Sequence, residues 1–374
     1  SESSLVQNVT NIEAGDTVVA CAFLGRTPAY ALADGTLLLA GVGEEKRVKA
    51  HADGAILVAL SDGKRFFTAG DDGLLIAADA EGRCETIADE KGRWIDALTL
   101  REDGAMAWSA GKSVRARDAK GDVKTFDAPS AVRGLAFLPK GYRLAIAHYN
   151  GASLWFPNAG KPEFLEWKGS HLDATVSPDG RFLVTSMQEN MLHGWRLADG
   201  KHMRMSGYPA KTRSFSWSPD GKWLATSGAD ACVVWPFETK DGPMGRGPRE
   251  CGVRPRRVSR VAFHPTNMVL AIGYEDGWVL LVRLNDGAEI FVRGERDSND
   301  AVTALAWDAA DNTFFRPLAK IPRTRPHFSS KPIGTPKHPS RSIQARSMLY
   351  LLSTSKIRTP PGRRTLTNSC IARP

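Results

Sequence analysis

Short apolar runs separated by turn residues recur along most of this 374-residue chain. Residues 182–187 and 223–226, for example, read FLVTSM and WLAT, and Gly, Asp or Asn residues stand close to each run. Apolar runs of this length bounded by turn residues predict β-strands joined as hairpins, because a helix would need a longer stretch with a 3.6-residue period.

The runs belong to a repeat with a period near 40 residues. Aligned segments begin at Ser61, Leu138, Ser177, Ser218 and His264, and each holds a turn, an apolar run, a second turn and another apolar run. The first turn returns at spacings of 37 to 46 residues, near Gly25, Gly63, Gly104, Gly141, Gly180, Gly221, Asn267 and Asp311. A period near 40 with paired turns predicts a four-stranded unit.

Polarity changes in a regular way across the four predicted strands of a unit. The inner strands, such as 132–138 and 212–218, are largely apolar, whereas the fourth strands at 162–167, 201–206 and 289–294 are more polar. This gradient indicates inner strands covered on both faces and an outer strand that is half solvated. Sheets of this kind bury both faces when they stack radially, so we expect an all-β fold, a β-propeller.

Two repeats carry a recognisable motif: SPDGRFLVTS begins at Ser177, and SPDGKWLATSGAD, followed by VVW, begins at Ser218. Trp155, Trp195 and Trp235 stand at the corresponding third-strand position. In these features the chain resembles degenerate WD40-repeat proteins over residues 5–311, in particular uncharacterised bacterial ones.

The chain also departs from that family. No third strand ends in Trp-Asp, and the His-containing lead-in survives mainly at residues 169–173. The resemblance therefore implies that the family's Ser/Thr–His–Asp–Trp hydrogen-bond network is incomplete in most blades.

The number of inner strands favours eight blades, with seven as the alternative. Eight inner strands are predicted to begin near Val18, Ala55, Asp96, Val132, His171, Thr212, Val258 and Ala301. The resemblance implies that residues 3–9 close the ring as the outer strand of the last blade. The propeller is thus assigned to residues 1–311, with its last blade incomplete because the repeat pattern stops after Asp311.

Residues 312–374 differ from the rest of the chain. They contain 13 Lys or Arg, nine Pro and no Asp or Glu, whereas residues 1–311 hold 37 basic and 41 acidic residues. The formal net charge of +9 therefore belongs to this segment. Such a composition predicts a disordered tail. We favour an out-of-frame origin over a genuine basic extension or a diverged blade, and only 347–355 has a strand pattern.

Several functional classes lack support in the sequence. No apolar run reaches the length of a transmembrane helix, and the first residues lack the features of a secretion signal. Signatures of serine hydrolases, P-loop proteins and zinc proteases are absent. We therefore expect a cytoplasmic chain without cofactor, metal or catalytic residues. The scattered cysteines have no metal-ligand spacing and predict reduced thiols: Cys21, Cys84, Cys232, Cys251 and Cys370.

Two sets of charged residues are candidates for binding a partner. The connection 242–260 is rich in arginine, including Arg254, Arg256, Arg257 and Arg260. A guanidinium cluster suits an acidic partner, a phosphate or a nucleic-acid backbone, and a solvated loop is the alternative. The lack of interleaved aromatic residues disfavours nucleic acid. Alignment on the first turn places a second set, with Arg260, near the central channel: Asp96, Arg133, Asp173 and Arg213.

The family resemblance implies a monomeric, non-enzymatic scaffold that binds protein partners, acidic ones included, and no membrane. An enzyme with a metal or carboxylate site in the channel is the first alternative. Binding of an anionic ligand or of nucleic acid through 242–260 and the tail is the second.

Overall fold

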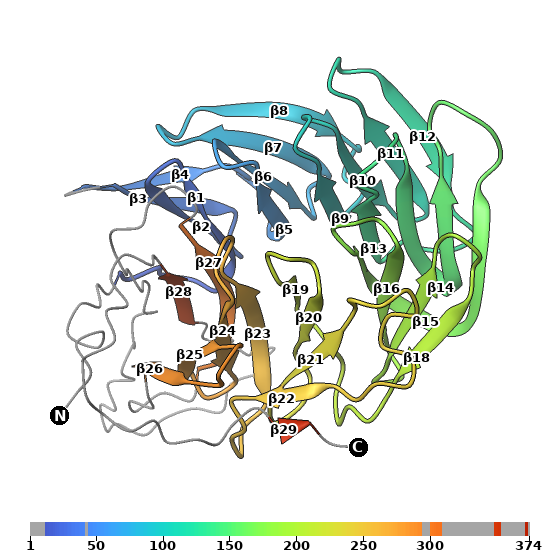
Figure 1. The fold of residues 1–374 in the computed structure, drawn as a ribbon. Coiled ribbons are helices and arrows are strands. Elements are labelled where there is room, and N and C mark those ends of the chain that lie inside the picture. The colour runs from blue at the N-terminus through green and yellow to red at the C-terminus, as the bar shows by residue number, and fades with distance from the viewer. Residues whose placement is uncertain (1–11, 42–43, 294–299, 309–347, 353–370, 373–374) are drawn as a thin grey trace, which may run out of the picture.

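The computed structural model describes residues 12–41, 44–293, 300–308, 348–352 and 371–372. Every regular element in these ranges is a β-strand, and the strands form sheets arranged around a central axis (Figure 1). The prediction of an all-β propeller is confirmed. The expected closing strand at residues 3–9 lies outside the described residues, as does most of 312–374.

The first three sheets each hold four consecutive strands. The first contains β1 (Val18–Leu24), β2 (Thr27–Leu32), β3 (Thr36–Gly41) and β4 (Glu44–Lys49). The second contains β5 (Ile56–Ser61), β6 (Arg65–Gly70), β7 (Leu74–Asp79) and β8 (Cys84–Asp89). The third contains β9 (Ile95–Leu100), β10 (Met106–Ala110), β11 (Ser113–Arg117) and β12 (Val123–Asp127). As predicted, the outer strands β4, β8 and β12 are largely exposed, whereas β2, β6 and β10 are buried.

The fourth sheet unites two predicted repeats in six strands. It contains β13 (Gly134–Phe137), β14 (Leu144–Trp155), β15 (Glu163–Val176), β16 (Phe182–Met187), β17 (Leu192–Arg196) and β18 (His202–Met205). Residues 163–166 of β15 pair with β14, and residues 171–176 pair with β16. One continuous strand therefore serves both as the outer strand of one repeat and as the inner strand of the next.

The later sheets follow in chain order. The fifth contains β19 (Phe215–Trp217), β20 (Trp223–Thr226), β21 (Cys232–Pro236), β22 (Arg249–Cys251) and the distant β29 (Ile371–Ala372). The sixth contains β23 (Val258–Phe263), β24 (Val269–Tyr274), β25 (Val279–Arg283) and β26 (Glu289–Arg293). A two-stranded sheet pairs β27 (Val302–Trp307) in parallel with β28 (Met348–Leu352), the one tail segment for which a strand pattern was predicted.

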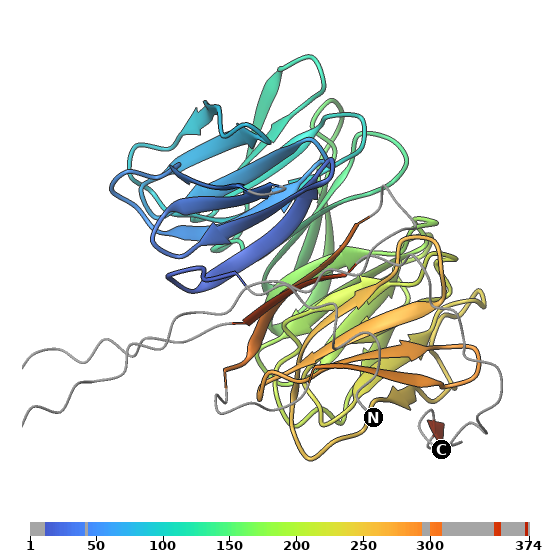
Figure 2. The same cartoon turned by 90° about the vertical axis from the view of Figure 1, so that its left-hand side faces the viewer.

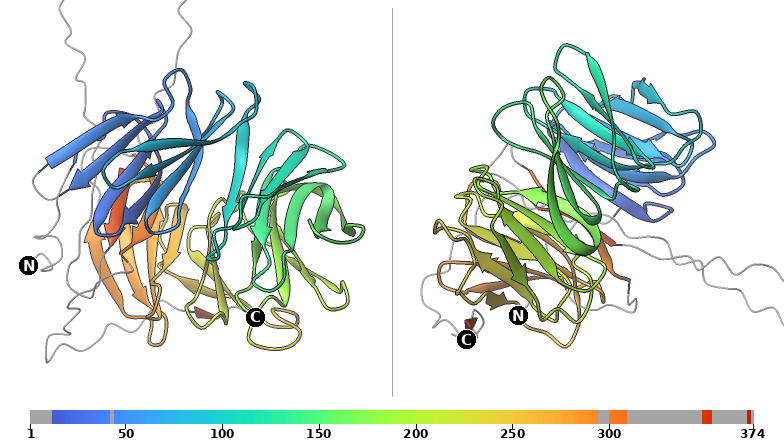
Figure 3. Two further views of the ribbon diagram at one scale, coloured as in Figure 1. Left: turned by 90° about the horizontal axis from the view of Figure 1, so that it is seen from above. Right: turned by 90° about the vertical axis from the view of Figure 1, so that its right-hand side faces the viewer.

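The described residues thus form six blade sheets of four or more strands, not eight or seven. Two features reduce the count. The fusion through β15 joins two repeats in one sheet, and the eighth inner strand, β27, has only β28 as a strand partner in the described residues. The sheets do not lie in one flat ring, since the blue sheets and the yellow and orange ones form two offset groups (Figures 2 and 3).

The recurring first turn is held by the side chains of its own motif. In SPDG, Ser177 Oγ donates to Asp179 Oδ1 at 2.8 Å and accepts the Phe182 amide at 3.0 Å. Asp179 Oδ1 also accepts the amide of Arg181 at 3.0 Å, and Gly180 has φ of 77°. Only glycine adopts such a φ without strain, so this local motif fixes the hairpin.

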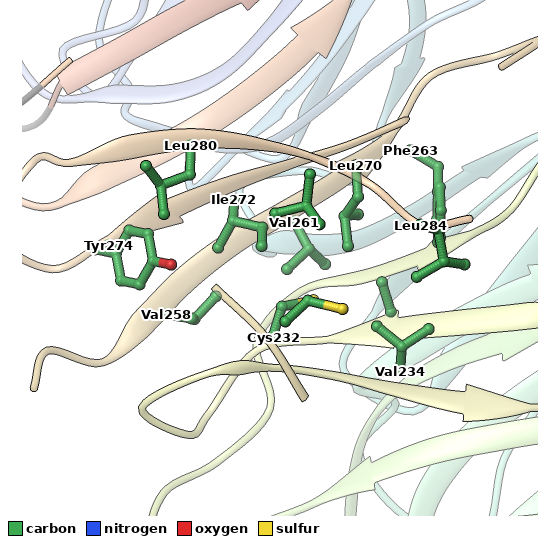
Figure 4. Close-up of a cluster of buried hydrophobic side chains, with 13 residues drawn as sticks. Cys232, Val234, Val258, Val261, Phe263, Leu270, Ile272, Tyr274, Leu280 and Leu284 are labelled. Atoms are coloured by element: carbon green, nitrogen blue, oxygen red, sulfur yellow. The ribbon is translucent and has the colours of Figure 1, made fainter. Parts of the chain in front are cut away.

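Apolar contacts between neighbouring sheets form the core. In one cluster, Cys232 and Val234 of β21 face Val261, Leu270 and Ile272 of the next sheet, and all five are buried (Figure 4). Each sheet buries little within itself, so stability depends on the contacts between sheets.

The two ends of the ring meet at β27, which lies between β23 and β1 (Figure 1). Trp307 Nε1 donates to the carbonyl of Ala262 in β23 at 2.9 Å. On the other side, Thr303 Oγ1 donates to the carbonyl of Val18 in β1 at 2.8 Å. The strand that begins the incomplete repeat therefore connects the first sheet with the sixth.

Candidate binding site at the channel

A cavity of about 510 Å³ lies among the inner strands, and we call it the axial cavity. Its lining comes from β5, β9, β13 and β15, from the end of β16 and the residue after it, from the segment before β19, and from β23. Five of the eight sequence-predicted site residues line it: Asp96, Arg133, Asp173, Arg213 and Arg260. The alignment of the repeats placed them together because each stands at the beginning of an inner strand.

Asp96 and Arg133 face each other across adjacent inner strands. Arg133 Nη1 lies 3.7 Å from Asp96 Oδ2, and both side chains are partly exposed. Burial raises the pKa of Asp96, and the positive charge of Arg133 acts in the opposite direction. An exposed pair at this distance contributes little to stability, so both groups remain accessible to a ligand.

Asp173 is the second carboxylate of the axial cavity, and like Asp96 it is exposed to solvent. Desolvation raises its pKa to about 6, opposed by a 2.8 Å hydrogen bond from the Ala174 amide and by the charge of Arg260. Its backbone touches β13 so closely that a Cβ on Gly134 would lie 2.6 Å from Asp173 Cα. The glycine is required here by this close approach of two strands.

Arg260 connects the cavity with the ring closure. Its Nε donates to the carbonyl of Thr303 in β27 at 2.8 Å, and Nη1 donates to the carbonyl of Ser259. Burial and the neighbouring Arg213 lower the pKa of Arg260, and Asp173 opposes them. Arg260 is therefore a half-buried cation that holds the ring closure and also lines the cavity.

A second cavity of about 290 Å³ adjoins the first, and we call it the rim cavity. It shares Lys211, Arg213 and Arg260 with the axial cavity and adds Arg257. Glu275 is the one carboxylate among the described residues that line it. The rim cavity is thus strongly cationic.

Arg254 and Arg256, which the sequence grouped with Arg257, have a different environment. Arg254 forms a two-point ion pair with the buried Asp276, at 3.1 and 3.0 Å, and its guanidinium lies 3.8 Å from the ring centroid of Trp278. Arg256 Nε lies 3.7 Å from the same carboxylate. Burial would raise the pKa of Asp276, but the hydrogen bonds from Arg254 bring it below its usual value. Arg254 therefore stabilises the fold and lines neither cavity.

Sequence reasoning missed a buried polar network at His51. Its Nδ1 lies 2.9 Å from Asp72 Oδ2, and its Nε2 lies 2.8 Å from Thr68 Oγ1. Threonine with an acidic residue four positions later also occurs at Thr185 and at Thr226. This spacing was a usable signal.

Other repeats build the same kind of buried network from different residues. Tyr208 stands where a histidine would, with its hydroxyl 2.6 Å from Thr226 Oγ1 and accepting a 2.7 Å hydrogen bond from Trp235 Nε1. In the fused sheet, His171 Nδ1 lies 2.6 Å from Thr185 Oγ1. These networks are buried and lie within the sheets or join connecting segments to them, so we assign them a structural role.

No cluster of three or more His, Cys, Asp or Glu suited to a metal ion occurs in the part of the chain that the structure describes. The described lining of the axial cavity contains two carboxylates, Asp96 and Asp173. The described residues also include no helix that is long and apolar enough to span a membrane.

Comparisons with known proteins agree with the propeller fold. Residues 203–235 match the family model described as WD domain, G-beta repeat. The chain is 32% identical to WD repeat-containing protein 1-B of Xenopus laevis over 114 residues, which are 30% of this chain and 18% of that protein. It is 25% identical to small ribosomal subunit protein RACK1z of Oryza sativa subsp. japonica, over 32% of this chain and 37% of that one.

A solved structure extends the likeness of fold. The computationally designed Ika8 protein superposes with a TM-score of 0.65 at 15% identity, covering 79% of this chain and 92% of that one. At this identity the match concerns the fold alone. The chain spans less than a fifth of the first curated relative and just over a third of the rice protein. Together the repeat match and the WD-repeat relatives support a WD40 protein.

Proposed function

We propose that this chain is a non-enzymatic platform for protein–protein interaction that binds an acidic segment of its partner at the rim and axial cavities. The observation that carries the proposal is the convergence of Lys211, Arg213, Arg257 and Arg260 on one cavity. Cations concentrated in a concave surface attract and orient an anionic partner. The propeller supplies a rigid frame for such contacts.

The remaining parts of the proposal follow from the sequence and the family resemblance. The acting unit is residues 1–311, the protein works as a cytoplasmic monomer, and no cofactor takes part. Within the cavities, Asp96 and Asp173 limit where an acidic segment can lie, because like charges repel. Specificity for the partner is therefore assigned to the two carboxylates, Asp96 beside Arg133 and Asp173. Affinity for the partner is assigned to Arg213 and Arg257.

Affinity capture with the full chain tests the proposal, followed by direct binding of the purified partner. The test variant combines Arg213→Glu and Arg257→Glu. Arg246→Glu is the matched control, because Arg246 lies in the same 242–260 connection but pairs with Glu238 at 2.8 Å and lines neither cavity. We expect the test variant to lose the partner and the control to retain it. A partner that binds the test variant as tightly as the natural chain would overturn the proposed surface.

A further inference from the structure

The signs of the charges at the beginnings of the inner strands follow an order that breaks once. Asp96, Arg133, Asp173 and Arg213 alternate in sign from one repeat to the next, and Arg260 then follows Arg213 with the same sign. Alternation places each charge beside an opposite one, whereas the break puts two cations at adjacent positions. Burial together with Arg213 lowers the pKa of Arg260, as expected for two neighbouring cations.

The rim cavity lies at this break. It contains both members of the like-charged pair and adds Lys211 from the segment before β19 and Arg257 from the segment before β23. Repulsion among four cations is unfavourable, and a bound anion adds attractive interactions that offset this repulsion. The cavity therefore has an electrostatic reason to hold a negative group.

A second observation is independent of net charge. The Nε atom of Arg257 is buried and has no hydrogen-bond partner among the described residues. A buried donor without a partner costs about 1–3 kcal/mol. Arg257 as a whole is half-buried and lines the cavity, so its guanidinium can reach an acceptor bound there. Guanidinium groups bind carboxylates through two parallel hydrogen bonds in such a geometry.

We propose that the rim cavity is an oxyanion site, formed by Arg213 and Arg257 with Lys211 and Arg260, that binds a carboxylate on an acidic segment of a protein partner. The volume of about 290 Å³ accommodates a carboxylate side chain with several waters. Glu275, the one carboxylate among the described lining residues, favours an anion held on the side of the arginines. The biological setting of this site rests on the proposed function, but the binding of the anion can be measured without the partner.

The probe is a fluorescent hexaglutamate peptide titrated into the full chain, with a hexaglutamine peptide as the uncharged comparison. The variants Arg213→Gln and Arg257→Gln remove one cation each from positions that are exposed or half-buried, and Arg246→Gln is the control. Urea unfolding of each variant checks that it folds. The basic residues of 312–374 add a peptide-binding background common to all variants, so only the component that differs between variants is assigned to the cavity.

We expect saturable binding of hexaglutamate that weakens about tenfold or more with each cavity variant and is unchanged in the control. Inorganic phosphate at constant ionic strength should compete with the peptide. Equal binding of hexaglutamate to the cavity variants and to the control would refute the site. Binding of phosphate without binding of hexaglutamate would refute the proposal that the anion is a carboxylate on a peptide. Oxyanion binding without any captured partner contradicts only the proposed function. A partner that is lost from the Arg213→Glu/Arg257→Glu variant, while hexaglutamate binds all variants alike, contradicts only this site.

Discussion

His193 in β17 is expected to make the stability of this protein depend strongly on pH. The side chain is fully buried, and neither ring nitrogen has a hydrogen-bond partner among the described residues. Its ring stacks on Trp167 at a centroid distance of 4.2 Å, with His202 at 5.3 Å on β18 and His171 at 6.3 Å on β15. Burial, followed by the charges of His202, His171 and Arg204, lowers the pKa of His193 to about 3.

The direction of the pH effect follows from this shift. The unfolded chain takes up a proton on His193 near pH 6.5, whereas the folded chain does so only near pH 3. The contribution of His193 is therefore constant above about pH 6.5 and falls as the pH decreases towards 3. Each pH unit well inside that window corresponds to about 1.4 kcal/mol, so the contribution of His193 to the free energy of unfolding falls by about 2 kcal/mol between pH 7 and pH 5.

The variant His193→Phe isolates this effect. It keeps an aromatic ring in the stack and removes both unpartnered nitrogens, so stability at pH 7 should be equal or higher. Urea unfolding followed by tryptophan fluorescence at pH 7 and pH 5 gives the free energies. We expect the difference between the two pH values to shrink by about 2 kcal/mol in His193→Phe. In His202→Phe, which alters the exposed member of the stack, the steep fall should persist. An unchanged pH dependence in His193→Phe would refute the reasoning.

Three further substitutions test the packing that supports the site, each measured as the free energy of unfolding in urea. Gly134→Ala places a methyl group against Asp173 and should cost about 1–3 kcal/mol. An unchanged free energy of unfolding would mean that β13 and β15 can move apart without cost, so the glycine would not be required. Arg254→Ala should cost about 3–5 kcal/mol by removing the two-point partner of the buried Asp276, whose remaining cationic partner is then Arg256 at 3.7 Å, and adding Asp276→Asn should recover part of the loss. Tyr208→Phe should cost about 1–3 kcal/mol through its two lost hydrogen bonds, and a change below 0.5 kcal/mol would contradict their importance.

The sequence predicted the strands well because the signals that define them are local. The turn at Gly180 is fixed by residues within five positions of one another, so its motif can be recognised without tertiary information. The eight predicted inner strands correspond to β1, β5, β9, β13, the second half of β15, β19, β23 and β27. Local chemistry specifies where a chain turns. The positions of these turns along the sequence then gave the repeat period.

The blade count was wrong because the grouping of strands into sheets is not local. Between the repeats joined by β15, residues 168–170 continue the strand across Gly169, where the other repeats have an irregular connection. Nothing in the glycine-containing sequence GSHLD excludes a turn at that point. Whether strand pairing continues there depends on the neighbours β14 and β16, which offer pairing partners on both sides.

The same distinction explains which site residues could be predicted. Arg213 and Arg260 occupy equivalent positions in successive repeats, so aligning the repeats was sufficient to place both at the channel. The role of Arg254 depends on Asp276 and Trp278, which reach it from the connection between β24 and β25. The position of a residue within a repeat therefore predicts where its side chain lies. The residues that pair with this side chain come from the next strands, and they decide whether its charge can bind a ligand. On this reasoning, the cations proposed to bind an acidic partner are those such as Arg257, whose buried Nε has no hydrogen-bond partner among the described residues.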